Sequence, residues 1–168
     1  SEVRDPVGKR YWPLPVGRDG CRSPMQWNAE ENAGFSSGNP WLKLHPDYAR
    51  RNVAAQQADP KSLFNFYRSL LHLRRSYPAL HSGSFTPLKK NPQRVLGYLR
   101  MEGRQTILVI LNFTAVSTEV QLGDELAQYK WELLLSNKER SQPVLNDCSF
   151  TLQGNEACIL IKKMKRQI

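Results

Sequence analysis

The spacing of apolar residues changes near residue 83, and this change limits the possible folds more than any other feature of the chain. Between Pro60 and about Tyr77 the apolar residues recur at helical spacing: Leu63, Phe66, Tyr67, Leu70, Leu71 and Leu73. From about Gly83 onward, short apolar runs alternate with turn residues, which is typical of β-strands. The pattern therefore predicts one long helix followed by a region of strands.

The helix carries recognisable signals at both ends. Asp59-Pro60 is typical of an N-cap followed by Pro at the first helical position. Arg74-Arg75 falls in the last turn, where positive charge suits the helix dipole, and Pro78 stops the helix. We expect a helix over residues 60–77, preceded by a short helical turn at 52–57.

The C-terminal half predicts an antiparallel β-sandwich of about five to seven short strands. Turns are expected at Glu102-Gly103-Arg104 and Gln153-Gly154-Asn155-Glu156. The run 106–113 is apolar on both faces and should be a central strand, with Asn112 as a hydrogen-bonded position. The expected strands are Val95–Arg100, Thr106–Phe113, Thr118–Leu122, Trp131–Leu135, Ser149–Leu152 and Ala157–Lys162.

Residues 1–48 show neither helical nor strand periodicity and are expected to form a long loop. A loop of this length is uncommon unless it is functional. It holds three of the four tryptophans, Trp12, Trp27 and Trp41. We expect these side chains to pack against other structure, although stacking on sugar rings is an alternative.

An ordered series of short motifs runs through the first half of the chain. Its longest member is the run from Gly17 to Trp27, Gly-Arg-Asp-Gly-Cys-Arg-Ser-Pro-Met-Gln-Trp. The other members are Arg4-Asp5-Pro6, Tyr11-Trp12-Pro13, Ala33-Gly34-Phe35-Ser36, Pro40-Trp41-Leu42, Asn52-Val53-Ala54-Ala55-Gln56 and Asp59–Arg68. The series resembles the oligo-1,6-glucosidase type of α-glucosidase, in family 13 of the glycoside hydrolases. Ser23, where Thr is usual, and Asn28, where Asp is usual, are small departures from that pattern.

The resemblance implies an α+β chain with two parts. Residues 1–81 would form the last loop and last helix of a catalytic (β/α)8 barrel, and residues 82–168 the C-terminal antiparallel β-sandwich. A complete barrel needs about 250 residues, more than the 168 present. The catalytic carboxylates of such enzymes lie upstream of the matched motifs, so we expect no catalytic residue here. The chain would be the non-catalytic portion of a retaining α-glucosidase.

Arg18 is the one candidate substrate-binding residue, a role that the resemblance implies. The Arg of this Gly-Arg-Asp motif reaches the glucose unit next to the cleaved bond, and a guanidinium donates several hydrogen bonds while staying charged. The alternative is a structural ion pair with Asp19 or with a barrel carboxylate. Arg22 is expected to be structural.

Other polar residues do not predict a reaction centre. A retaining glycosidase needs two carboxyl groups about 5 Å apart, whereas Glu30-Glu31, Glu102 and Asp124-Glu125 lie among polar turn residues. His45, His72 and His81 show no spacing for acid–base work. We expect no metal and no cofactor. The three cysteines, Cys21, Cys148 and Cys158, favour a reducing, cytoplasmic setting, with a bridge between Cys148 and Cys158 left open.

Composition restricts the partners. The net charge of +9 is dispersed except for a basic cluster at 162–166, which favours a solvated tail over nucleic-acid binding. The longest apolar run, 107–111, is far short of the roughly 20 residues that a membrane span needs. The expected partners are α-glucoside oligosaccharides, and a second copy bound through the barrel-facing side of the helix. Bond preference stays open, as does a stand-alone carbohydrate-binding or interaction module.

Overall fold

The computed structural model describes residues 3–88, 92–140, 144–145 and 149–163. Residue contacts divide the chain into two compact units, Ser1–Tyr67 and Arg68–Ile168. The division falls inside the long helix because the second half of that helix packs on the sheet of the second unit. The domain boundary expected between residues 81 and 82 stays a prediction.

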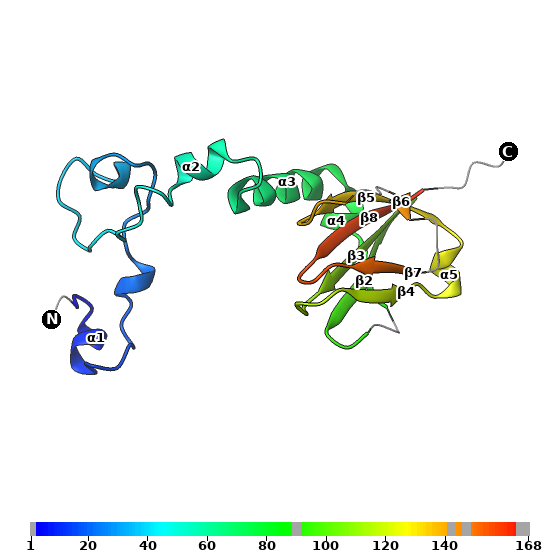
Figure 1. The fold of residues 1–168 in the computed structure, drawn as a ribbon, viewed down its shortest axis with the longest axis horizontal. Coiled ribbons are helices and arrows are strands. Elements are labelled where there is room, and N and C mark those ends of the chain that lie inside the picture. Colours follow the sequence, from blue (N-terminus) through cyan, green and yellow to red (C-terminus); the bar gives the residue numbers. More distant parts are fainter. Residues whose placement is uncertain (1–2, 89–91, 141–143, 146–148, 164–168) are drawn as a thin grey trace. The chain divides into compact units, whose positions relative to one another are not determined.

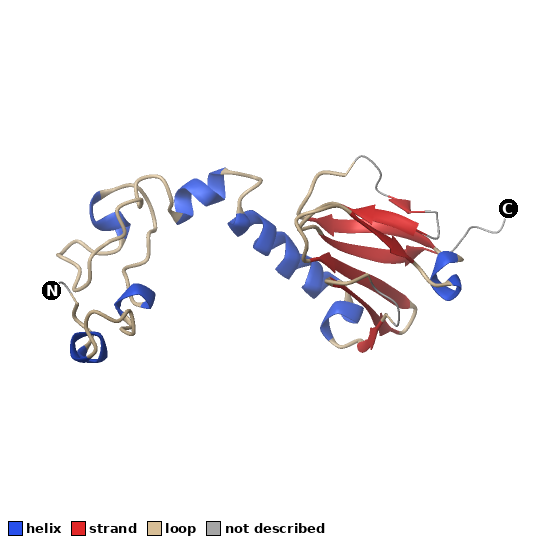
Figure 2. Ribbon diagram, turned by 60° about the horizontal axis from the view of Figure 1, so that its bottom comes forward, coloured by secondary structure: helices blue, strands red, loops and turns tan. Residues whose placement is uncertain are grey.

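The first unit is mostly loop with short helical turns (Figure 2). These are α1 (Pro6–Arg10), η1 (Asp19–Cys21), η2 (Glu31–Gly34) and α2 (Val53–Ala58). The loop expected over 1–48 is therefore interrupted three times, and the expected turn at 52–57 is α2. Among its described residues the unit buries two hydrophobic side chains, Ala33 and Leu42, but four polar ones: Asp5, Asn52, Ser62 and Asn65. Hydrogen bonds, not an apolar core, organise this unit.

Helix α3 (Leu63–Ser76) begins later than the predicted start at Pro60. The Asp59 carboxylate does not cap it, because Oδ1 accepts the N–H of Lys61 at 2.9 Å in the preceding turn. The Ser62 hydroxyl instead accepts the N–H of Asn65 at 3.2 Å. The predicted helix is thus confirmed, with its N-terminal signal shifted to Ser62.

Pro78 both ends α3 and begins a short helix, α4 (Pro78–His81). Pro suits a first helical position because it has no N–H to leave unsatisfied. The chain then turns at Gly83, where a Cβ would lie 2.4 Å from the carbonyl oxygen of Ala79. Glycine is needed at this close approach between α4 and the first strand.

The described residues of the second unit form two antiparallel sheets (Figure 1). The larger sheet has the order β1-β2-β3-β8-β5-β6, and β4 pairs with β7 in the smaller one. The strands are β1 (Ser84–Pro87), β2 (Val95–Glu102), β3 (Gln105–Asn112), β4 (Thr118–Gln121), β5 (Lys130–Ser136), β6 (Val144–Leu145), β7 (Ser149–Leu152) and β8 (Ala157–Lys163), with a helical turn α5 (Asp124–Ala127) before β5. The predicted antiparallel fold is confirmed, and β3 is central. The sequence pattern missed β1 and β6.

Both faces of the larger sheet are covered by hydrophobic clusters. Between the sheets lie Val95, Leu99, Leu108, Ile110, Val120, Leu122, Trp131, Phe150, Leu152, Cys158 and Leu160. On the opposite face, α4 packs Ala79 and Leu80 onto Ile107, Val109 and Ile159. The apolar residues on both sides of β3 thus contact a cluster on each face.

The two predicted turns have different roles. Gly103, with φ +54°, lies between Glu102 and Gln105, which are paired across the β2–β3 hairpin. The turn at Gln153–Glu156 is not a hairpin, because β7 pairs with β4 and β8 pairs with β3 and β5. It carries the chain from one sheet to the other.

The described cysteines are free thiols, Cys21 exposed and Cys158 buried. Cys148 and the end of the basic cluster, residues 164–166, lie outside the described residues. No helix in the part of the chain that the structure describes is long and apolar enough to cross a membrane.

Candidate functional site

Two aspartates hold the start of the Gly17–Trp27 run against the N-terminal segment. The Asp5 carboxylate accepts the backbone N–H of Arg18 at 2.9 Å. The Asp19 carboxylate accepts the backbone N–H groups of Arg4 and Asp5 at 2.7 and 3.0 Å. Each aspartate side chain therefore binds the backbone of the other segment, an arrangement that we call the Asp5–Asp19 clasp.

The guanidinium of Arg18 is held by the same Asp5 carboxylate. Nη2 of Arg18 lies 2.7 Å from Oδ1 of Asp5, and Nε donates to that oxygen at 3.3 Å. The Asp5 side chain is 1% exposed, whereas that of Arg18 is 51% exposed. Within the described part of the chain, Nη1 of Arg18 has no hydrogen-bond partner. One edge of the guanidinium is thus fixed, and the other is free to bind a ligand.

Both members of this pair are charged at neutral pH. The side-chain hydrogen bond from Arg18 lowers the pKa of Asp5 to about 2, against the opposing effect of burial. The same bond, together with the negative charge of Asp5, raises the pKa of Arg18. The ion pair therefore persists across the physiological range.

Two glycines allow α1 to approach the start of the run. A Cβ on Gly8 would lie 3.2 Å from Cα of Gly17 and 2.7 Å from a methyl carbon of Val3. A Cβ on Gly17 would lie 3.1 Å from Cα of Gly8. The clasp can close because neither position carries a side chain.

The end of the run is anchored by helix α2. The N–H groups of Val53 and Ala54 donate to the carbonyl oxygens of Gln26 and Trp27, both at 2.9 Å. These N–H groups have no acceptor inside the helix, so the end of the Gly17–Trp27 run satisfies the hydrogen bonds of the first turn of α2. Nε2 of Gln26 also donates to Asp47 at 3.1 Å.

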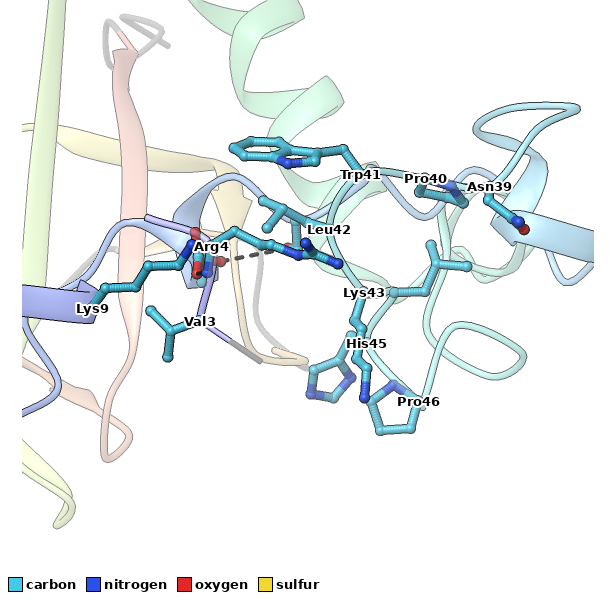
Figure 3. Close-up of a pocket in the computed structure, with 14 residues that line it drawn as sticks. Val3, Arg4, Lys9, Asn39, Pro40, Trp41, Leu42, Lys43, His45 and Pro46 are labelled. Atoms are coloured by element: carbon cyan, nitrogen blue, oxygen red, sulfur yellow. Dashed lines mark hydrogen bonds between the residues drawn. The ribbon is translucent and has the colours of Figure 1, made fainter. Parts of the chain in front are cut away.

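A cavity of about 890 Å³ adjoins the clasp (Figure 3). Arg4, Lys9 and residues 19, 20 and 23 line it from the N-terminal segments, and residues 39–46 line it from the following loop. Trp41, 65% exposed, belongs to this second wall. Arg18 is not among the lining residues, so the cavity and the exposed edge of Arg18 are separate features.

His45 has a carboxylate neighbour that the sequence motifs did not predict. Nδ1 of His45 contacts Oδ1 of Asp47, and Nη1 of Arg51 lies 3.5 Å from Oδ2 of the same residue. The hydrogen bond from Gln26 lowers the pKa of Asp47, with His45 acting in the same direction. The His-Pro-Asp order of residues 45–47 could have predicted this contact. The described residues contain no group of three or more His, Cys, Asp or Glu that could hold a metal ion.

The remaining sequence candidates are on the surface. Glu30, Glu31, Glu102, Asp124 and Glu125 are all exposed, as expected. The three loop tryptophans are also exposed: Trp12 by 63%, Trp27 by 50% and Trp41 by 65%. Within this chain they do not pack as core residues, so the expected packing partner remains a prediction.

Within the described part of the chain, the guanidinium of Arg18 makes its ion pair with Asp5 and not with the neighbouring Asp19. The alternative of a carboxylate elsewhere in a barrel stays a prediction. The Asp19 oxygens instead accept the backbone N–H groups of Arg4 and Asp5. The sequence motifs did not predict Asp5 as this partner, because an Asp-Pro pair before a helix points to an N-cap and not to a contact with a residue thirteen positions away.

Family models match both parts of the chain. The model of the α-amylase catalytic domain matches residues 4–83, and the model of the maltogenic amylase C-terminal domain matches residues 85–159. The chain belongs to the α-amylase family. The clasp, the cavity and α3 lie in the part matched by the catalytic domain of that family, and the sandwich lies in the part matched by the C-terminal domain.

Relatives within the α-amylase family are much longer than this chain. A probable oligo-1,6-glucosidase 2 of Bacillus subtilis (strain 168) is 39% identical over 74% of this chain and 22% of its own length. An α-glucosidase of Pediococcus pentosaceus is 38% identical over 85% of this chain and 27% of its own length. The crystal structure of the trehalulose synthase MutB from Pseudomonas mesoacidophila MX-45 superposes with a TM-score of 0.76 and 35% identity, covering 88% of this chain and 26% of that one. The chain thus spans about a quarter of the proteins that it matches.

Proposed function

We propose that the chain is the C-terminal, non-catalytic portion of a retaining α-glucosidase that acts on terminal α-glucosidic bonds of oligosaccharides. The observation that carries the proposal is the catalytic-domain match over 4–83, followed at once by the C-terminal-domain match over 85–159. In this proposal, residues 1–81 are the last loop and helix of a (β/α)8 barrel, and residues 82–168 are the domain behind it.

In the proposed enzyme, Arg18 binds the glucose unit next to the cleaved bond. Support comes from its geometry: Asp5 occupies Nε and Nη2, and Nη1 faces no acceptor among the described residues. A guanidinium edge fixed in this way donates to sugar hydroxyls without first losing much side-chain freedom.

Exposed apolar side chains support the proposal that this chain is part of a larger enzyme. In the first unit they include Tyr11, Trp12, Trp27, Phe35 and Trp41, each about half exposed or more. Apolar surface of this kind marks an interaction site when it is contiguous. We propose that the rest of the barrel covers it in the whole enzyme, and that the isolated chain self-associates through the exposed side of helix α3.

Helix α3 supports the same view. Leu63, Tyr67 and Leu71 recur every fourth residue and are 66%, 55% and 57% exposed, whereas Leu70, Leu73 and Tyr77 pack against the sheet. The apolar stripe predicted for this helix is thus exposed on one side and covered on the other. We further propose a cytoplasmic location, which suits the free thiols of Cys21 and Cys158.

Two activity measurements test the proposed function. The purified 168-residue chain should release no nitrophenol from p-nitrophenyl α-glucoside, because its reacting carboxylates would lie elsewhere. In a chimera, this chain replaces the matched C-terminal segment of the Pediococcus α-glucosidase. The chimera should hydrolyse the same substrate. A folded chimera without turnover, or turnover by the chain alone, would contradict the proposal.

The alternative is a stand-alone carbohydrate-binding module in the sandwich. Such a module needs an exposed aromatic platform. Phe85 is 57% exposed, but its ring is tilted 39° from that of Tyr98, and Lys162 lies over the ring of Tyr129 at 4.2 Å. Glucan affinity of the chain, measured by calorimetry and lost in a Phe85→Ala variant, would favour this alternative.

A further inference from the structure

We infer that Asp5 is the positioning residue for Arg18, and that substrate recognition by Arg18 depends on it. This inference rests on the proposed function, since it concerns the sugar contact assigned there to Arg18. It goes beyond that function by assigning a role to a residue that never touches the sugar.

The first argument is the number of bonds that join the two residues. Asp5 accepts the backbone N–H of Arg18 at 2.9 Å, Nη2 at 2.7 Å and Nε at 3.3 Å. One carboxylate therefore fixes Arg18 at its main chain and at the end of its side chain. An arginine anchored at both ends loses most of its rotamer freedom before a ligand arrives.

The second argument is burial. The Asp5 side chain is 1% exposed, so a ligand cannot reach its oxygens, whereas half of the Arg18 side chain is open to solvent. Asp5 must therefore act through Arg18 and not by contact with a substrate. This separates a positioning residue from a catalytic one.

The third argument concerns Asp19, the neighbour that could have competed for Arg18. Its oxygens accept the backbone N–H groups of Arg4 and Asp5. Asp19 thus holds Asp5 in place, and Asp5 holds Arg18. The close contact of Gly8 with Gly17 keeps the two segments at the distance that this arrangement needs.

The first experiment uses the 168-residue chain and measures the orientation of Arg18. The Nε–Hε signal of Arg18 should be resolved and slowly exchanging in NMR spectra of the wild type, and averaged in Asp5→Asn. The matched control Asp124→Asn, at an exposed position, should leave the signal unchanged. An Arg18 signal that is unaffected by Asp5→Asn would overturn the inference without bearing on the proposed function.

The second experiment uses the chimera with the Pediococcus α-glucosidase and a double-mutant cycle. Asp5→Asn should lower kcat/KM about 10- to 100-fold, because small displacements of a binding group have effects of this size. Arg18→Met should lower it at least as far, and the double variant should be no worse than Arg18→Met alone. Additive losses would overturn the inference, because Asp5 would then act independently of Arg18.

A conservative variant separates positioning from folding. Asp5→Glu keeps the charge but lengthens the side chain by one methylene, so it should shift Arg18 and lower kcat/KM while the chimera stays folded. If the wild-type chimera is active and both Asp5→Glu and Asp5→Asn keep full activity, the positioning role of Asp5 is refuted but the proposed function is not. A folded wild-type chimera without activity would refute the proposed function, and this inference with it.

Discussion

Arg140 and the buried Glu156 form an ion pair that joins the two sheets of the sandwich. Nε and Nη2 of Arg140 lie 2.6 and 2.8 Å from the two carboxylate oxygens, and the side chains are 14% and 0% exposed. Ser136 and the backbone N–H of Gln153 donate to the same carboxylate. The pair ties the segment after β5 to the turn between β7 and β8. It is a structural pair, distant in sequence from the clasp.

Removing the charge of Glu156 should destabilise the second unit strongly. Glu156→Gln leaves the largely buried Arg140 guanidinium, 14% exposed, without its counter-charge, and breaking a fully buried pair costs about 3 to 5 kcal/mol. Urea unfolding followed by the fluorescence of buried Trp131 measures the effect. The control Glu102→Gln, at an exposed position, should change the free energy of unfolding by no more than about 0.5 kcal/mol. Equal stabilities of the two variants would contradict the expected role of the pair.

The clasp should weaken in acid within a defined pH window. The folded-state pKa of Asp5 is about 2, below the ordinary value of 3.8. The unfolded chain therefore binds more protons between these values, and the stabilisation by Asp5, complete above them, is lost as the pH falls from about 4 through 2. A ¹³C NMR titration of the Asp5 carboxyl group should give the low pKa. Arg18→Met should raise it, and an unchanged value would argue against the ion pair.

The described cysteines should differ sharply in reactivity. Burial raises the pKa of Cys158 to about 11, and its thiol donates to the Glu156 carboxylate, whereas Cys21 is exposed. In a Cys148→Ser background, one equivalent of Ellman's reagent should react promptly at neutral pH, and the second only after unfolding. Loss of the prompt reaction in Cys21→Ser identifies the thiol. Prompt reaction of Cys158 would show that its site opens readily.

Two glycine substitutions should have unequal effects. A Cβ on Gly154 would lie 2.1 Å from the carbonyl oxygen of Ala115, whereas one on Gly123 would meet nothing within 4 Å. Gly154→Ala should cost about 1 to 3 kcal/mol or more, because backbone must move. Gly123→Ala should have a small effect, and chemical denaturation compares the two. Similar losses would mean that the turn adapts more easily than its contacts suggest.

Self-association should depend on the exposed side of α3. Replacing Leu63, Tyr67 and Leu71 by Gln removes the exposed apolar stripe without removing a buried side chain. Sedimentation velocity should show the wild type associating with rising concentration and the triple variant remaining monomeric. Leu96→Gln, at a 43% exposed position of β2, serves as the control. A wild-type chain that stays monomeric at high concentration would contradict the proposed self-association.

Much of the fold follows from local sequence rules. The 3.6-residue spacing before Pro78 predicts α3, since burial of one helix face imposes that period, and the short apolar runs between turn residues after Gly83 predict the main strands. The N-terminal signal at Asp59-Pro60 was misleading because Ser62, and not Asp59, caps the helix by accepting the N–H of Asn65. The strand β1 was missed because all four of its residues are exposed, which leaves no alternation to detect.

The family and its motif order could be read from the sequence alone, because the Gly17–Trp27 run and its companions are local patterns. Tertiary structure alone decided that Arg18 pairs with Asp5, thirteen residues away, and that Asp19 does not compete. It also decided that the turn at 153–156 joins two sheets instead of closing a hairpin. Ion pairs and sheet partners depend on distances between segments remote in sequence, and local spacing carries no information about those distances.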